Sequence, residues 1–402
     1  SCKPQTKSTG SMAKFDEAPE WAASAIWYQI FVERFRNGNP NNDPTMETNR
    51  GALIDEIPAS WQITPWGHNW YVQESWAKET GLDFYRTIQM RRYGGDLEGV
   101  MQKVNYLQDL GINAVYFNPL NDAPSLHKYD ARNYHHIDVT FGDDRDGDLA
   151  LMKKEDPSKP ESWVWTSADK KFVELISQFH KAGIKVVLDF SWNHTGTQFW
   201  AFQDIIKNGA SSRFAGWYEI KTFDNAATPE NEWNYDGWLG IKSLPELKKI
   251  RESEKKFGHA FEGNMPEEVK AHIFAVCKRW MDPNNDGNPD DGIDGMRLDV
   301  AEHVPLGFWR DMRKYVRSVN ESFYLVGENW WTQWPDELMD AEPWVKGDVF
   351  DAVMHYQWYK PVRAYLNQGD DKISLEALYD ALDSLYNKYR PSTQDAMMNL
   401  VS

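Results

Sequence analysis

Cysteine is almost absent from this chain of 402 residues, which has only Cys2 and Cys277. Two cysteines do not make a disulfide framework. Cys277 lies in the helix-like pattern 269–280 and is predicted to be a small buried residue. Cys2 opens a polar stretch rich in Ser, Thr and Lys, and residues 1–20 are predicted to be a disordered tether.

Positive charge is also scarce. Lys and Arg number 44 against 61 Asp and Glu, which gives a formal net charge of −17. Nucleic acids and anionic membrane surfaces are bound by basic patches, so the charge argues against both as partners. No apolar run is long enough to cross a bilayer, so no transmembrane segment is expected. A neutral polymer tolerates such a charge.

Aromatic residues, in contrast, are abundant, with 20 Trp, 18 Tyr and 19 Phe. Flat apolar rings with a polar edge suit stacking against the faces of sugars, although most of these rings are predicted to be core. The chain also contains three apolar strand-like runs that end in polar residues, at 183–195, 292–300 and 323–330. Helical segments separate them, which indicates a barrel of parallel strands with its site at their carboxyl ends.

The run 292–300 carries two charges within an apolar stretch. Because side chains alternate along a strand, Arg297 and Asp299 point to the same face. An unpaired charge among apolar neighbours is unfavourable, and an arginine beside an aspartate holds that aspartate ionised. An ionised carboxylate at the end of a buried strand suits a nucleophile. The alternative is a structural ion pair, which would be the better interpretation of an isolated R-x-D.

Five segments, in order and in spacing, resemble successive sequence regions of the α-amylase family of glycoside hydrolases (glycoside hydrolase family 13). They are His127-Lys-Tyr-Asp130, V-V-L-D-F-S-W-N-H at 186–194, Ser243-Leu-Pro-Glu-Leu247, G-M-R-L-D-V-A-E-H at 295–303 and V-G-E-N-W at 326–330. The resemblance extends from about Ile26 to the end of the sequence. Within the family, the chain looks most similar to the neopullulanase and cyclomaltodextrinase branch.

The resemblance implies an α/β fold, a (β/α)8 TIM barrel with a small extra domain, domain B, after the third strand. Residues 21–194 and 266–402 are therefore expected to form the barrel, and residues 195–265 domain B. The sequence stops near the seventh strand, so the barrel is expected to be incomplete here. The eighth strand, the usual C-terminal β-domain and the family's third carboxylate are expected beyond Ser402.

The resemblance also implies roles for individual residues. Asp299 is expected to be the nucleophile and Glu328 the general acid and base, the pair that glycoside hydrolysis requires. If the enzyme retains configuration, their carboxyl groups should lie ~5–5.5 Å apart. In the family, the matching histidines hydrogen-bond sugar hydroxyls and the matching tyrosine stacks on the sugar ring. The expected substrate-binding residues are Arg297, His194, His127 and Tyr129.

The loop 37–44, after the first strand-like run, is dense in side-chain oxygens and turn formers. From the residues alone, a plain turn is the better interpretation, because Asn and Asp side chains often bond their own backbone. The family resemblance favours structural Ca²⁺, a cation that prefers hard oxygen ligands. The predicted ligands are Asn37, Asn39, Asn42 and Asp43, completed by Gly67 and Asn69.

The function implied by the resemblance is retaining hydrolysis of α-1,4-linked glucans such as maltooligosaccharides, pullulan or cyclodextrins. Two alternatives stay open: a transglycosylase that passes the glycosyl-enzyme to another sugar, and a glucan-binding protein without catalysis. Intact Asp299 and Glu328 argue against the second. Cys2 before a polar tether resembles the mature start of a bacterial lipoprotein, which implies a lipid anchor and a periplasmic or cell-surface location. A cloning artefact is the alternative origin of Cys2.

Overall fold

The central element is a parallel sheet of seven strands in the order β1-β2-β3-β8-β9-β12-β13. A computed structural model describes residues 16–52, 57–335, 337–367 and 369–400. Within these residues the sheet curves into a nearly closed barrel, so the predicted TIM-barrel class is confirmed with seven of its strands. The strands are β1 (Trp27–Ile30), β2 (Ala114–Phe117), β3 (Lys185–Phe190), β8 (Gly295–Leu298), β9 (Tyr324–Gly327), β12 (Ala352–His355) and β13 (Met398–Asn399).

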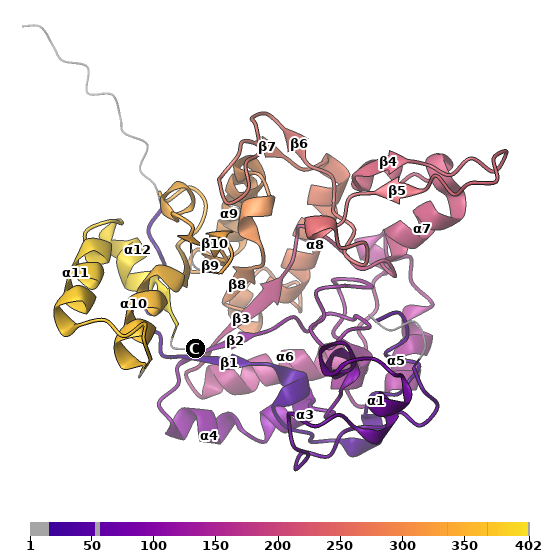
Figure 1. The fold of residues 1–402 in the computed structure, drawn as a ribbon, viewed down its shortest axis with the longest axis horizontal. Coiled ribbons are helices and arrows are strands. Elements are labelled where there is room, and N and C mark those ends of the chain that lie inside the picture. The colour runs from indigo at the N-terminus through magenta and orange to yellow at the C-terminus, as the bar shows by residue number, and fades with distance from the viewer. Residues whose placement is uncertain (1–15, 53–56, 336, 368, 401–402) are drawn as a thin grey trace, which may run out of the picture.

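Helices surround the strands. Figure 1 shows α3, α4 and α6 along one side of the sheet and α8 and α9 along another. The helices in the connections between the barrel strands include α3 (Leu97–Met101), α4 (Val104–Asp109), α5 (Arg145–Met152), α6 (Ser167–Lys181), α8 (Glu267–Met281), α9 (Leu306–Val319), α10 (Tyr356–Leu366), α11 (Leu375–Tyr386) and α12 (Pro391–Ala396). Two short helices, α1 (Ser75–Glu79) and α2 (Phe84–Thr87), lie in the long connection between β1 and β2.

Helix α6 shows how the sequence sets these elements. Thr166 caps its first turn and accepts a hydrogen bond from the Asp169 amide, while the Asp169 side chain bonds back to the Thr166 amide. This reciprocal capping satisfies two amides that a helix start leaves unpaired. The helix ends before Gly183, which adopts a φ of +74° that favours glycine. Strand β3 follows at once and is buried along nearly its whole length.

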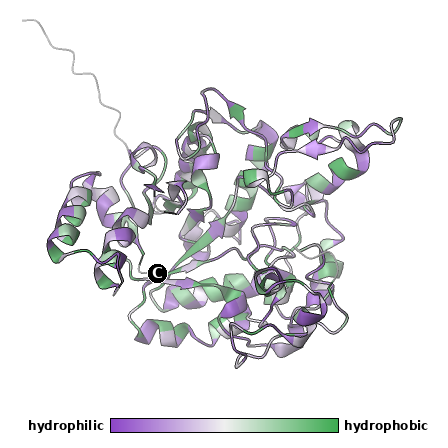
Figure 2. Cartoon of the chain, in the orientation of Figure 1, coloured by the Kyte–Doolittle hydropathy of each residue, from purple (hydrophilic) through white to green (hydrophobic). Residues whose placement is uncertain are grey.

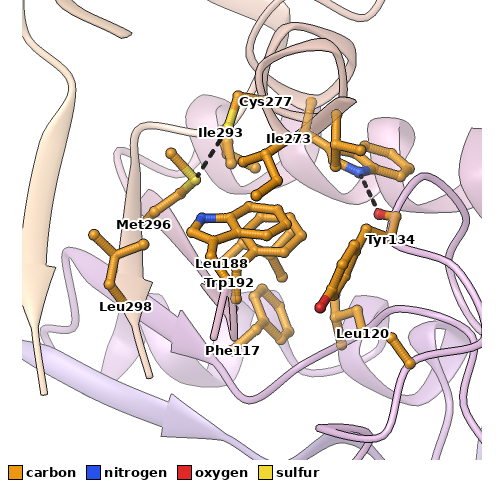
Figure 3. Close-up of a cluster of buried hydrophobic side chains, with 14 of the residues drawn as sticks. Phe117, Leu120, Tyr134, Leu188, Trp192, Ile273, Cys277, Ile293, Met296 and Leu298 are labelled. Atoms are coloured by element: carbon orange, nitrogen blue, oxygen red, sulfur yellow. Dashed lines mark hydrogen bonds between the residues drawn. The ribbon is translucent and has the colours of Figure 1, made fainter. Parts of the chain in front are cut away.

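The core lies between the sheet and these helices. Trp192 is fully buried and stacks on Phe190, with ring centroids 4.5 Å apart. Figure 3 shows it among side chains from β2, β3, β8 and α8, including Phe117 and Met296. Cys277 is buried in the same cluster, as predicted, with its sulfur 4.0 Å from that of Met296. Strand β3 is correspondingly hydrophobic in Figure 2.

Residues 195–265 form an excursion between β3 and α8 that extends to the upper right in Figure 1. It contains helix α7 (Trp200–Asn208) and two small antiparallel sheets. One sheet pairs β4 (Ile220–Thr222) with β5 (Asn234–Tyr235), and the other pairs β6 (Ile250–Arg251) with β7 (Gly263–Asn264). A further two-stranded sheet, β10 (Trp331–Gln333) with β11 (Glu337–Leu338), follows β9.

The amino-terminal part of the predicted tether, including Cys2, lies outside the described residues. From residue 16 the chain is in contact with the barrel: Arg390 donates to the Asp16 carbonyl at 2.8 Å and pairs with Glu17 at 2.8 Å. Among the residues that the structure describes, no helix has the length and apolar character that a membrane span requires.

Candidate active site

The register of three neighbouring strands brings the polar ends of β3, β8 and β9 together. Asp189 of β3 is paired with Arg297 of β8, and Leu298 of β8 with Gly327 of β9. The ladder continues beyond the strands, because the Asp299 amide donates to the Phe190 carbonyl at 3.0 Å. The Glu328 amide likewise donates to the Leu298 carbonyl at 2.9 Å. Two acids from adjacent strands therefore leave the sheet at the same level.

Arg297 joins these acids. Its Nη1 lies 2.7 Å from Asp299 Oδ1, its Nη2 lies 2.7 Å from Glu328 Oε1, and its Nη1 is 3.2 Å from Asp189. The second oxygen of Glu328 accepts from the Val300 amide at 2.9 Å. A single planar guanidinium thus orients two carboxylates that face one pocket, a task that suits its fixed fork of donors.

The charge balance of this cluster corrects one sequence expectation. Arg297 does contact Asp299 and acts to lower its pKa, but it is shared among three carboxyl groups and is outweighed by two opposing effects. Burial, and then the nearby Glu328, raise the pKa of Asp299 well above its usual range. Burial also raises the pKa of Asp189, although Arg297 opposes that shift. Both shifts favour the protonated form of an acid in this cluster, and glycoside hydrolysis needs one protonated acid in such a pair.

A pocket of about 520 Å³ opens over the two acids. Asp299 and Glu328 both line it, together with His127, Tyr129, Asp130 and His194. Its other walls are largely apolar and aromatic. They are Gly51, Ala52, Trp238, Leu239, Ile241, Ser243, Leu244, Phe257, Val300, Glu302, His303, Trp330, Trp331 and Trp334.

Four of the predicted substrate-binding residues have distinct places here. Arg297 is 4% exposed and does not line the pocket, so it orients the acids from beneath. Tyr129 presents its ring to the pocket while its hydroxyl donates to Asp189 at 2.8 Å. The His127 ring lies parallel to that of Tyr129, 5.7 Å away. Burial lowers the pKa of His194 to about 3, so this imidazole is neutral.

Two residues beside the site have left-handed backbones. Lys128, between His127 and Tyr129, has a φ of +62°, and Val300, after Asp299, has a φ of +41°. This conformation is strained for a β-branched residue such as valine. Lys128 is held by a 2.7 Å ion pair with Asp138. Both turns change the direction of the chain so that side chains on either side of them enter the pocket.

The predicted site residues did not include Asp189 or Lys249. Asp189 accepts from the Tyr116 and Tyr129 hydroxyls at 2.7 and 2.8 Å, and its position at a strand end was a usable signal. Lys249 is buried and donates to the Asn193 carbonyl at 3.0 Å and to the Asn193 side chain at 2.6 Å. Burial lowers the pKa of Lys249 to about 8. No local pattern identifies Lys249, because its partner is 56 residues away.

The predicted calcium loop is only partly assembled from the predicted residues. Asn37 Nδ2 donates to Asp43 Oδ1 at 2.6 Å, and Asn37 Oδ1 is buried without a hydrogen-bond partner. Burial raises the pKa of Asp43. Asn39 donates to Asp143 at 3.2 Å. Asn42 donates to the carbonyls of residues 139 and 142 and accepts from the amide of residue 145.

Gly67 and Asn69 do not join this loop in the contacts of the described structure. Both are exposed, and Asn69 Oδ1 accepts from the Tyr71 amide in a local turn. Gly94 and Asp96 lie beside the loop instead. A Cβ at Gly94 would be 2.5 Å from Asp43 Oδ1, and Asp96 accepts from the amides of residues 38, 39 and 99. The signal that could have pointed to them is the turn Gly94-Gly-Asp96 before a helix.

Comparison with known sequences agrees with this site and fold. Residues 29–156 and 167–401 match the family described as "Alpha amylase, catalytic domain". Neopullulanase 2 of Thermoactinomyces vulgaris is 34% identical over 352 residues, which cover 88% of this chain and 45% of that protein. The maltogenic alpha-amylase of Bacillus acidopullulyticus is 32% identical over 392 residues, which cover 97% of this chain and 51% of that protein.

Solved structures give the same result. The cyclic alpha-maltosyl-(1→6)-maltose hydrolase of Arthrobacter globiformis superimposes with a TM-score of 0.68 at 27% identity, covering 96% of this chain and 66% of that one. The type III pullulan hydrolase of Thermococcus kodakarensis has a TM-score of 0.69 at 26% identity, covering 96% and 55%. The chain therefore belongs to the α-amylase family. It spans about half the length of the curated relatives that it matches.

Proposed function

We propose that this protein hydrolyses α-1,4-glucosidic bonds of α-glucans with retention of configuration, through a covalent glycosyl-enzyme. The observation that carries the proposal is the pair Asp299 and Glu328, two acids on adjacent strands that line one pocket and share the guanidinium of Arg297. The aromatic walls of the pocket suit the apolar faces of sugar rings. The relatives named above, a neopullulanase and a maltogenic amylase, support an α-glucan substrate.

In the first step, an Asp299 carboxylate oxygen bonds to the anomeric carbon and the glycosidic C–O bond breaks. The leaving oxygen takes a proton from Glu328, the general acid of the pair. In the second step, a water gives a proton to Glu328 and its oxygen bonds to the anomeric carbon. The ester bond to Asp299 breaks and the carboxylate is restored. Such a double displacement retains configuration.

Neutral hydrogen-bonding groups surround this centre. His194 remains uncharged in its buried position, so it exchanges hydrogen bonds with sugar hydroxyls without adding positive charge. Tyr129 offers its ring to the sugar because its hydroxyl is already held by Asp189. Arg297 keeps both acids oriented as a proton moves between them and the substrate.

The test compares wild type with Asp299→Asn and Glu328→Gln on maltooligosaccharides, pullulan and cyclodextrins. We expect wild type to release products whose anomeric configuration, followed by NMR, is that of the substrate. Both variants should lose at least about a thousandfold in kcat, as removal of essential catalytic groups usually does. Inverted product would refute the double displacement, and equal inactivity of all three proteins would favour a glucan-binding protein. New, longer oligosaccharides at high acceptor concentration would identify a transglycosylase.

We also propose a structural Ca²⁺ in the loop 37–44. The unpartnered Asn37 oxygen and the half-buried Asp43 carboxylate fit a hard cation, and Asp96 supplies a further carboxylate next to the loop. Asn42 fits less well, because its side chain is already engaged by backbone groups. Bound Ca²⁺ would neutralise these acids and stiffen the loop. Exhaustive chelation should lower Tm, and readdition of Ca²⁺ should restore it; an unchanged Tm would contradict this site.

We also propose a lipid anchor at Cys2 and, with it, a periplasmic or cell-surface location. They are supported by the polar composition of the residues that follow Cys2. Mass spectrometry of the protein from its natural source decides the matter, since an unmodified Cys2 would exclude the anchor.

A further inference from the structure

Away from the pocket, three side chains with metal-binding atoms converge. His135 and His136 belong to the connection after β2, and Glu155 belongs to the segment 142–166 of the same connection, which leads to α6. Each offers one ligand atom, and these atoms lie within 4.8 Å of one another. Their side chains are 0%, 0% and 4% exposed. Nothing in the catalytic proposal uses these three residues.

The distances between them are close to those around a bound ion. His135 Nε2 lies 2.7 Å from Glu155 Oε1, and His136 Nε2 lies 3.1 Å from both Glu155 oxygens. Zinc binds histidine nitrogen and carboxylate oxygen at about 2.0–2.2 Å, so ligand atoms around a tetrahedral ion are about 3.3 Å apart. The distances from Glu155 would have to lengthen by about 0.6 Å for His135 and about 0.2 Å for His136 to admit the ion between these atoms.

The second ring nitrogen of His136 has a fixed partner. Nδ1 lies 2.7 Å from Asp169 Oδ2, which leaves Nε2 for the site. Asp169 is itself held by the Ile137 amide at 2.8 Å and by Arg279 Nη2 at 2.9 Å. A carboxylate that orients the far nitrogen of a metal-binding histidine is a regular feature of protein metal sites.

An independent observation comes from the neighbouring polar atoms. His135 Nδ1 and His272 Nε2 are both buried without a hydrogen-bond partner. The two rings are 6.4 Å apart, and Trp163 stacks on His135 at 4.2 Å. Buried polar atoms are seldom left unpaired, so two such nitrogens beside a ligand set support a further polar partner at this place. A metal-bound water that donates to His272 Nε2 would complete four ligands.

We propose that His135, His136 and Glu155 bind one divalent transition-metal ion of the zinc type. Imidazole nitrogens with a carboxylate suit Zn²⁺ and Co²⁺ and are unlike the all-oxygen sets that Ca²⁺ takes. The ion would link the segment 142–166 to His135 and His136. These two histidines follow His127 and Tyr129 of the pocket by a few residues in the same connection. It would therefore act on the stability of one pocket wall and take no part in bond cleavage.

The test uses the whole chain, freed of metal and titrated with Co²⁺, because tetrahedral Co²⁺ absorbs visible light strongly. We expect one equivalent to bind with that spectrum, Zn²⁺ to displace it, and excess Ca²⁺ to leave it unchanged. His135→Gln and Glu155→Gln should each weaken Co²⁺ binding at least tenfold. His180→Gln is the matched control, since His180 also pairs with one carboxylate, Asp294, at 2.7 Å but, within the described residues, belongs to no group of three metal-binding side chains.

Circular dichroism shows whether each variant is folded, and either folded variant suffices for the comparison. No tetrahedral spectrum in wild type would overturn the proposal and leave an ion pair of His136 with Glu155 and Asp169. One-equivalent binding that persists in both folded variants would overturn it too, and would place the metal elsewhere in the chain. Neither readout depends on hydrolytic activity, so the proposed function can fail or succeed separately.

Discussion

Replacement of Arg297 by methionine is the sharpest perturbation of the acid cluster. Methionine fills a similar volume but removes the cation that faces Asp189, Asp299 and Glu328. Removal of one partner from a buried ion pair usually destabilises a protein by about 3–5 kcal/mol. Because three carboxyl groups lose the same partner, we expect the upper part of that range, about 4–5 kcal/mol. This is a large share of the roughly 5–15 kcal/mol by which proteins are stable.

Arg313→Met is the matched control. Arg313 is also 4% exposed and bonds to Asp351 at 3.0 Å, but Asp351 keeps a second cation, Arg317. The control should therefore lose less stability, about 1–3 kcal/mol, the usual value for a charged hydrogen bond. Urea unfolding followed by circular dichroism measures both losses.

The dependence on pH adds a second readout. Without Arg297, the three acids would have higher pKa values in the folded protein than in the unfolded chain, because they are buried next to one another without a cation. A raised carboxyl pKa makes stability fall as pH rises above the unfolded value near 4. The deficit of Arg297→Met should therefore be larger at pH 8 than at pH 5, while that of Arg313→Met changes less. Equal losses in the two variants, with no difference in pH dependence, would refute the shared-cation account.

Three further predictions rest on single residues. Asp299→Asn should raise the free energy of unfolding more at pH 8 than at pH 5. The pKa of the buried Asp299 is raised, so its negative charge becomes more unfavourable as the pH rises, and the variant removes that charge. Urea unfolding that shows unchanged or lower stability of the variant at pH 8 would contradict this. His194 has a folded pKa of about 3, below the unfolded value near 6.5, so wild type should lose about 2 kcal/mol between pH 6.5 and 5 that His194→Gln does not lose. A parallel loss in both proteins would count against the buried neutral imidazole. Tyr129→Phe should destabilise the protein by only about 0.5–1.5 kcal/mol, the value of one hydrogen bond. It should nevertheless lower kcat/KM for maltooligosaccharides more than tenfold, because Asp189 and Arg297 lose a contact that positions them. An unaltered kcat/KM would exclude that role.

The strands and the acid pair could be predicted because their signals are local. The apolar runs that end in Asp189, Asp299 and Glu328 reveal both the strand type and the side on which the site lies. Parallel pairing then places these ends together without further information. The limits of a strand are less apparent from such patterns: of the run 348–355, only Ala352–His355 forms β12.

The ionisation of the cluster and the outline of the calcium loop depend on contacts between distant segments. The sequence shows that Arg297 lies near Asp299, but only the folded chain shows that the same guanidinium also serves Glu328 and Asp189. Gly67 and Asn69 were predicted to complete the ligand set of the calcium loop, but the structure places both on the surface. The chain instead returns to the loop 37–44 at Gly94 and Asp96, after an intervening stretch that carries two short helices.

Lys249 has a consequence for how the pocket accommodates substrates of different width. It belongs to the excursion 195–265, and it bonds twice to Asn193, three residues beyond the end of β3. The side of the pocket formed by Trp238 is therefore attached to the stiff end of a barrel strand. Outward displacement of that side would break both hydrogen bonds of a buried ammonium to Asn193, which is unfavourable. Under the proposed function, a wider sugar would therefore be accommodated at the wall that carries Trp331 and Trp334, which belongs to the hairpin of β10 and β11 and not to the excursion.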